Sequence, residues 1–156
     1  MQIVLNSKMF SELSVSGLGE KAKELGYDGT DVCVRPGHPV HPGNAPDALP
    51  DAVKTWKSQG LVCSMATAPT GMIDPGASEV EGMYAACADA GVPRLKIGFW
   101  KFREGDDYWK VVDSARADLA GFVKYSEKYG VQTCYQIHSG PNIGSNSAGL
   151  MHLIQG

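Results

Sequence analysis

The sequence predicts an α/β fold in which parallel strands alternate with helices. Four helix-like stretches end at a glycine and lead at once into a strand-like run, at Gly26, Gly60, Gly91 and Gly130. Glycine is typical of the left-handed position that closes a helix. The strand-like runs are almost continuously apolar or small, as expected for strands covered on both faces. Together these observations indicate a parallel sheet with right-handed crossovers.

The elements follow one another in a regular order. The runs that predict strands read QIVLNSKMF, TDVCVR, LVCSMATA, RLKIGFW and VQTCYQIH. In the helix expected before Gly91, Ser78 and Glu81 have the spacing of a capping box. The helix expected before Gly130 has one apolar stripe, and a fifth helix is expected in SNSAGLMHLIQG, closed by Gly156.

The repeat length reduces the number of folds that fit the sequence. Successive helix-ending glycines are 34, 31 and 39 residues apart, and eight such units would make the roughly 250 residues of a (β/α)8 TIM barrel. The 156 residues hold about five units. A five-stranded flavodoxin-like domain would also fit this length. We therefore weigh one domain over residues 1–156, a TIM barrel truncated at its C-terminus, against a complete five-stranded sheet.

The loops favour the barrel. The stretch after the first strand lacks both GxGxxG and GxxxxGK[ST], the phosphate-binding turns of nucleotide-binding sheets. In a barrel the active site collects groups from many strand ends on one face. Polar residues do follow every predicted strand: Lys8, Arg35, His38, His41, Thr67, Lys101, Gln136 and His138.

Composition and charge exclude several classes of protein. The net charge is −3 and no cluster of Lys and Arg stands out, so we expect no nucleic-acid partner. No stretch is long and apolar enough for a membrane span, and the first residues lack a secretory signal, so we expect a cytoplasmic protein. The four cysteines show no tight ligand spacing, which argues against zinc-ribbon and disulfide frameworks.

Several stretches resemble the xylose isomerase-like TIM barrels, the superfamily of sugar phosphate isomerases and epimerases that also includes endonuclease IV. They are KMF, ELGYDGTDVCVRPGHPVHP, ATAPTGMIDP, KIGFWKF, GVQTCYQIHSG and GSNSAGLMHLIQG, which cover essentially the whole chain. The resemblance implies an eight-unit barrel of which this chain is the N-terminal part. It also implies an enzyme that acts on a sugar or polyol by metal-assisted proton or hydride transfer next to a carbonyl.

The resemblance also implies a divalent metal, Mn, Mg, Zn or Co, at the mouth of the full-length barrel. Its ligands in this family are a Glu, an Asp, a His and a Glu from strands five to eight, and the strand-five Glu corresponds to Gln136. A Gln carbonyl can ligate a hard cation but brings no charge and cannot act as a base. Gln136 is therefore a candidate but weakened metal ligand, and the fragment alone is expected to be inactive.

Strand alternation places Gln136 and His138 on one face, where both can reach the barrel mouth. Neutral imidazole ligates transition metals and carries protons near neutral pH, so His138 is a candidate metal ligand and catalytic group. A hydrogen-bonded histidine that closes the strand end is the structural alternative.

Four further residues are candidates. Lys96 lies in an apolar strand and either contacts a substrate oxygen or phosphate as a catalytic group, or pairs with Asp31 inside the barrel. Trp100 either stacks on a sugar or closes the barrel. Arg35 and His38, on a proline-stiffened loop, are candidate substrate-binding residues or solvent-exposed side chains.

Three functions remain open from the sequence. The first is a sugar or polyol isomerase or epimerase with a small carbohydrate substrate. The second is a barrel that binds a sugar without converting it, because Gln136 replaces the acid. The third is an endonuclease IV-like phosphodiesterase, which the missing basic surface and the few His and acidic ligands disfavour.

Overall fold

The computed structural model, which describes residues 1–155, contains one sheet of five strands in the order β1-β2-β3-β4-β5. Each neighbouring pair is parallel, with Val4 beside Gly29 in the first pair and Arg94 beside Gln132 in the last. The strands are β1 (Val4–Asn6), β2 (Gly29–Cys33), β3 (Val62–Thr67), β4 (Arg94–Lys96) and β5 (Gln132–Cys134). The predicted α/β fold with parallel strands is confirmed.

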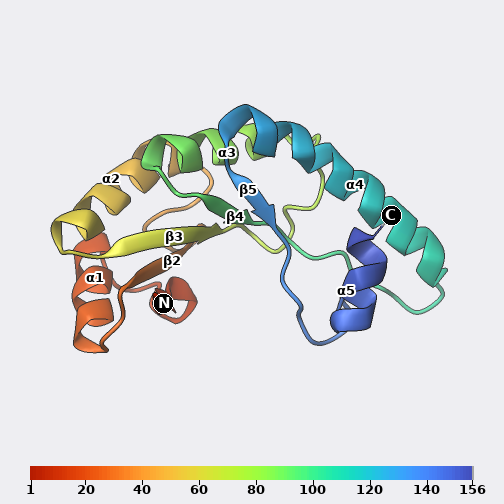
Figure 1. Cartoon of the computed structure of the whole chain (residues 1–156), viewed down its shortest axis with the longest axis horizontal. Coiled ribbons are helices and arrows are strands. Elements are labelled where there is room, and N and C mark those ends of the chain that lie inside the picture. The colour runs from red at the N-terminus through yellow and green to blue at the C-terminus, as the bar shows by residue number, and fades with distance from the viewer. Residues whose placement is uncertain (156) are drawn as a thin grey trace.

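Helices α1 to α4 form an arc along the outer side of the sheet, and α5 lies beside α4 near the C-terminus (Figure 1). The helices are η1 (Ser7–Met9), α1 (Val15–Glu24), α2 (Ala45–Ser58), α3 (Ser78–Ala90), α4 (Tyr108–Tyr129) and α5 (Ser147–Ile154). In the part of the chain that the structure describes, no helix combines the length and the apolar character that a membrane span requires.

The glycines expected to end helices do so. Gly26, Gly60, Gly91 and Gly130 have φ values of 78°, 80°, 70° and 66°. Glycine adopts this left-handed conformation without the steric penalty of a Cβ. Each one reverses the chain from the helical layer back into the sheet, which is how the repeated βα units arise.

The core lies between the sheet and the arc of helices. Trp56, Tyr84 and Phe122 are no more than 1% exposed there, and burial of an aromatic side chain of this size contributes about 1.5–3 kcal/mol. Leu95 and Ile97 of the β4 segment are fully buried in the same layer. Because side chains alternate along a strand, Lys96 between them lies on the opposite, inner face.

Two local predictions differ from the structure. The strands are shorter than the apolar runs: β4 ends at Lys96, after which the N–H groups of Gly98 and Phe99 donate to Met72 O and Thr70 O at 2.8 and 3.1 Å. The capping box expected at Ser78 is wrong, because Ala77 is the N-cap residue and has no side-chain cap. Ser78 Oγ instead contacts the neighbouring Glu79 at 3.4 Å.

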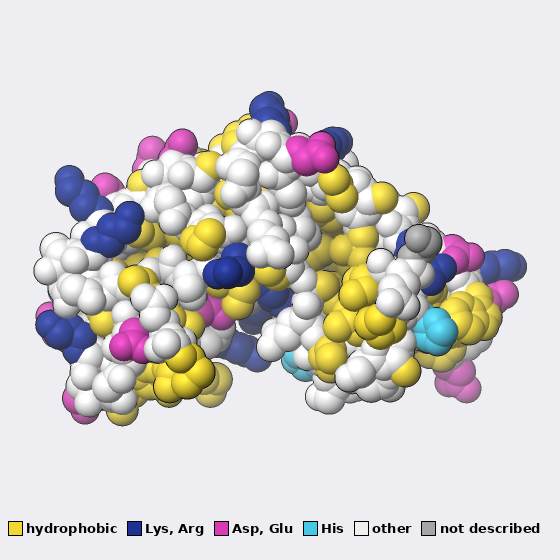
Figure 2. All heavy atoms as spheres, viewed as in Figure 1, with side chains coloured by type: hydrophobic (Ala, Val, Ile, Leu, Met, Phe, Trp, Pro, Cys, Tyr) yellow, Lys and Arg dark blue, Asp and Glu magenta, His cyan; other side chains and the backbone are white. Residues whose placement is uncertain are grey.

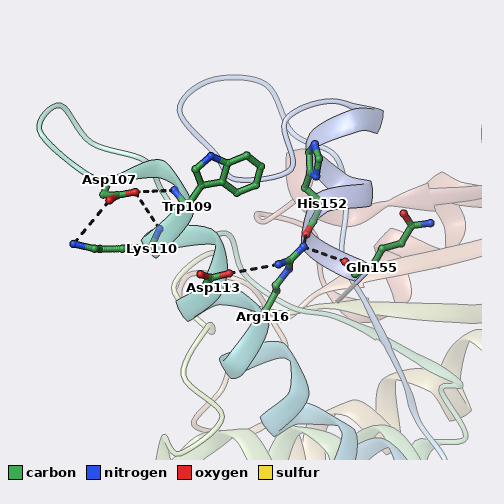
Figure 3. A network of polar contacts seen from close by, with 7 residues as sticks. All are labelled: Asp107, Trp109, Lys110, Asp113, Arg116, His152 and Gln155. Carbon is green, nitrogen blue, oxygen red and sulfur yellow. Dashed lines mark hydrogen bonds and ion pairs between the residues drawn. The ribbon is translucent and has the colours of Figure 1, made fainter.

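Helix α5 is held against α4 by one arginine (Figure 3). Arg116 of α4 donates to the carbonyl oxygens of His152 and Gln155, the latter at 3.0 Å, where helix α5 leaves carbonyls without partners. The Trp109 and His152 rings meet edge to face with centroids 5.2 Å apart. His152 thus has a packing role, and the cap expected at Gly156 lies outside the described residues.

Candidate active site

The carboxyl ends of β1, β2 and β3 are joined by hydrogen bonds to one buried carboxylate. Asp31 is 7% exposed and accepts from Asn6 Nδ2 at 2.7 Å and from Thr67 Oγ1 at 2.9 Å. Burial raises the pKa of Asp31, while the hydrogen bonds from Asn6 and Thr67 act in the opposite direction. Each carboxylate oxygen therefore has a neutral donor.

Lys96 lies on the inner face of the sheet beside this group. It is 3% exposed, and its Nζ lies 3.8 Å from the centre of the Phe99 ring. Burial, assisted by the positive charge of Arg35, lowers the pKa of Lys96 to about 8. Among residues 1–155 the Nζ forms no ion pair. Asp31, the partner that the sequence offered as an alternative, acts on Lys96 only through its charge, without direct contact.

A pocket of about 190 Å³ opens above Lys96 at the carboxyl ends of the strands. Its walls come from all five strands or the segments that follow them: Asn6, Lys8, Cys33, Arg35, Thr67, Thr70, Lys96, Phe99, Gln136 and His138. In the space-filling view, Lys and Arg side chains lie in the hollowed middle of the molecule (Figure 2). Four predicted residues, Lys96, Arg35, Gln136 and His138, are thus brought together.

The β5 side of the pocket is open to solvent. Gln136 and His138 are both exposed, and Nδ1 of His138 lies 2.9 Å from Ser139 O. The carbonyl is the nearer partner of Nδ1, with Asn142 Nδ2 at 3.4 Å, and it favours the tautomer with the proton on Nδ1, in which Nε2 can accept a proton or bind a metal. The His138 ring also meets Phe99 edge to face, with centroids 4.8 Å apart.

The other two predicted residues lie elsewhere. Trp100 is 5% exposed, and its Nε1 donates to Asp118 of α4 at 2.8 Å, so the indole packs against the helical layer and not into the Lys96 pocket. His38 lines a separate small apolar pocket with Phe10 and Trp56. Partial burial and the charge of Arg35 lower the pKa of His38.

Phe99 and Asn6 are pocket residues that the sequence did not single out. Alternation along the run RLKIGFW assigns Trp100 to the inner face with Lys96, but the strand ends at Lys96 and the alternation ends with it. Asn6 closes β1, and its position as the first polar residue after the apolar run IVL is a signal that would have identified it.

The pocket residues do not by themselves fit a divalent cation. No group of three or more His, Cys, Asp and Glu side chains that could hold a metal occurs within residues 1–155. Gln136 and His138 are two possible ligands, and three cationic side chains share the same pocket. Any further metal ligands would have to come from residues other than 1–155.

Solved structures with a similar fold include sugar epimerases. The 3-keto-D-glucoside 4-epimerase YcjR from E. coli matches with a TM-score of 0.74 at 13% identity, over 99% of this chain and 64% of its own. The chain has the fold of the corresponding part of a TIM barrel, as the resemblance to the xylose isomerase-like barrels implied. Family models and curated proteins show no match to the sequence.

Two further solved structures extend the comparison. D-allulose 3-epimerase from Methylomonas sp., solved in complex with D-allulose, has a TM-score of 0.73 at 10% identity, over 99% of this chain and 59% of its own. IOLI protein, solved with a binding zinc atom, has a TM-score of 0.65 at 16% identity, over 86% and 51%. The chain thus spans about 60% of the length of such barrels, as the sequence predicted from the unit count.

Proposed function

We propose that the chain belongs to a sugar or polyol epimerase or isomerase that moves a proton next to a carbonyl group. The observation that carries this proposal is the pocket at the carboxyl ends of all five strands, in a fold whose solved neighbours include several sugar epimerases. In such barrels the active site lies at this end. A carbohydrate is the substrate class, and the whole barrel is the active unit.

Two side chains of this chain are candidates for proton transfer. Lys96, with its pKa lowered to about 8, is partly neutral just above neutral pH and can accept a proton in that form. His138 offers Nε2 from the opposite side of the pocket. A metal requirement is part of the proposal, with Gln136 and His138 as two of its ligands, and the zinc-containing IOLI neighbour supports it.

Hydrogen exchange with solvent tests the proposal. The protein at its full natural length is incubated in D2O with ketohexoses, and deuterium at the carbon beside the carbonyl is followed by NMR. Exchange should occur, should depend on added Mn²⁺ after EDTA treatment, and should fall at least tenfold in Lys96→Met or His138→Gln, because a positioned acid or base contributes at least about 100-fold. Lys54→Met removes an exposed charge on α2 and is the control.

A barrel that binds sugar without converting it is the second candidate. Gln136 favours it, because an amide cannot act as the acid or base that a carboxylate supplies at the mouth. Saturable sugar binding without deuterium incorporation or product would support this reading and contradict the epimerase.

A further inference from the structure

Three positively charged side chains converge on the Lys96 pocket, and its lining contains no carboxylate. Lys8, Arg35 and Lys96 lie in the walls, from the ends of three different strands. None of them forms an ion pair among the residues that the structure describes. The whole chain has a net charge of −3, so the positive charge at this site is local.

Asp31 offsets only part of this charge. It is not among the residues that line the pocket, and its two oxygens accept from Asn6 and Thr67. This one carboxylate interacts electrostatically with Lys96 and Arg35, and Lys8 adds a third cation to the lining. The pocket therefore keeps an excess of positive charge.

Two of the cations have nitrogen atoms without a hydrogen-bond partner among the residues that the structure describes. The Lys96 side chain is only 3% exposed, and its Nζ lies over the Phe99 ring and forms no ion pair within residues 1–155. Arg35 Nε is buried and has no partner in the same part of the chain. A buried donor without an acceptor destabilises the fold, and more so when it is charged. An oxyanion bound in the pocket would supply the missing acceptor.

We propose that this pocket binds the anionic group, a carboxylate or a phosphate, of an acidic sugar. The planar guanidinium of Arg35 suits two-point contact with oxyanions, and the ammonium groups of Lys8 and Lys96 add charge from two sides. A neutral hydroxyl of a free sugar would leave most of this charge uncompensated. The proposal that the ligand is a sugar rests on the function proposed above, whereas the proposal that it is an anion does not.

Calorimetric titration of the protein at its full natural length tests this proposal. The ligands are inorganic phosphate, D-glucose 6-phosphate, D-gluconate and D-glucose, at constant ionic strength set with chloride. The phosphate compounds or gluconate should bind at least tenfold more tightly than glucose. Comparison of the two anions shows whether phosphate or carboxylate is the preferred group.

Matched variants distinguish anion binding in the pocket from the effect of the protein's overall charge. Arg35→Met and Lys96→Met should each weaken anion binding about 10-fold to 100-fold, the range of a lost hydrogen bond to a charged group. Lys54→Met removes the same charge from the exposed face of α2 and should change nothing. Far-UV circular dichroism verifies that each variant is folded, and Arg35→Lys, which keeps the charge, should bind more tightly than Arg35→Met.

Equal binding of glucose and glucose 6-phosphate, or an equal loss of affinity in Lys54→Met, would overturn the proposal. Anion binding without deuterium exchange into any sugar would contradict the epimerase and leave the anion site supported. Exchange on neutral sugars, with no response to phosphate or gluconate, would support the epimerase and overturn the anion site.

Discussion

The two sides of the pocket differ in how firmly they hold their side chains. On the β2 to β4 side, Asp31 and Lys96 are 7% and 3% exposed and lie among strands that are paired on both edges. On the β5 side, Gln136 and His138 are exposed and follow the end of β5, which within residues 1–155 pairs with β4 alone. The pair Gln136 and His138, which stands out in the sequence, thus lies on the open side. The buried charges of Asp31 and Lys96 lie in strands whose sequences look like ordinary hydrophobic core.

This difference separates two roles. The buried side has fixed charges whose environment sets their pKa, as the lowered pKa of Lys96 indicates. The exposed side has groups with free bonding capacity, such as Nε2 of His138. Preorganised charge on one side and adaptable donors on the other would suit a site that first captures an anion and then acts on the attached sugar.

The largest expected effect on stability is that of a methyl group added after β4, on the buried side of the pocket, compared with one added on α5, outside the pocket. A Cβ on Gly98 would lie 2.4 Å from Thr70 O and 2.9 Å from Met72 O, so Gly98→Ala should destabilise the fold by about 3 kcal/mol. A Cβ on Gly149 of α5 would meet its nearest atom at 3.4 Å, so Gly149→Ala should change stability by less than about 1 kcal/mol. Urea midpoints of the two variants measure both effects, and equal losses would refute the contrast.

The sequence predicted the repeated architecture better than the details of the site. The helix-ending glycines and the apolar runs are local signals, and they were sufficient for the parallel sheet and for Lys96 on its inner face. Simple alternation would place Trp100 on the inner face with Lys96, but bonds from Gly98 and Phe99 to the loop before α3 redirect the chain after Lys96. Those bonds join segments distant in sequence, and no local pattern records them.

The loop after β2 is a second place where local sequence patterns do not reveal which side chains reach the pocket. Arg35 and His38 look equivalent on the proline-rich stretch RPGHPVHP. The N–H of Arg35 donates to Val40 O at 3.2 Å, and the N–H of His38 donates to Arg35 O at 3.1 Å, so the loop folds back on itself. Arg35 lines the pocket as a result, while His38 packs near Phe10 and Trp56.

The next largest effect is a dependence of stability on pH that originates in Lys96. Its folded pKa of about 8 lies below the ordinary value of 10.5, because burial disfavours the ammonium and Arg35 repels it. Between these two values the unfolded chain binds more protons, so this group makes the fold more stable as pH rises from about 8 to about 10.5. Lys96→Met should remove that rise, which amounts to about 1–3 kcal/mol at roughly 1.4 kcal/mol per pKa unit.

Urea unfolding of wild type and Lys96→Met at pH 7.5, 9 and 10 measures this rise as a difference between the two proteins. The other charged groups that face Lys96 are Arg35, Asp31, Cys33 and Lys8. They are present in both proteins, so their titration largely cancels in the difference. Lys54→Met should follow wild type, and a constant difference between wild type and Lys96→Met at all three pH values would show that the ammonium is not desolvated.

The smallest expected effect on stability belongs to Gln136→Glu on the open side. The side chain is exposed, so the free energy of unfolding should change by less than about 0.5 kcal/mol. The new carboxylate would lie with His138 in the pocket lining and would offer a charged oxygen ligand for Mn²⁺. Titration with MnCl2, on the protein at its full natural length, should show about tenfold tighter binding than wild type.

The same substitution should weaken anion binding, because it places a negative charge among Lys8, Arg35 and Lys96. Gln132→Glu is the matched control, since it adds the same charge at the other, exposed end of β5. If Gln132→Glu raised Mn²⁺ affinity and lowered phosphate affinity equally, the effect would come from net charge and not from the pocket. Opposite changes in metal and anion affinity, confined to Gln136→Glu, would show that the open side of the pocket selects between a cation and an anion through one exposed side chain.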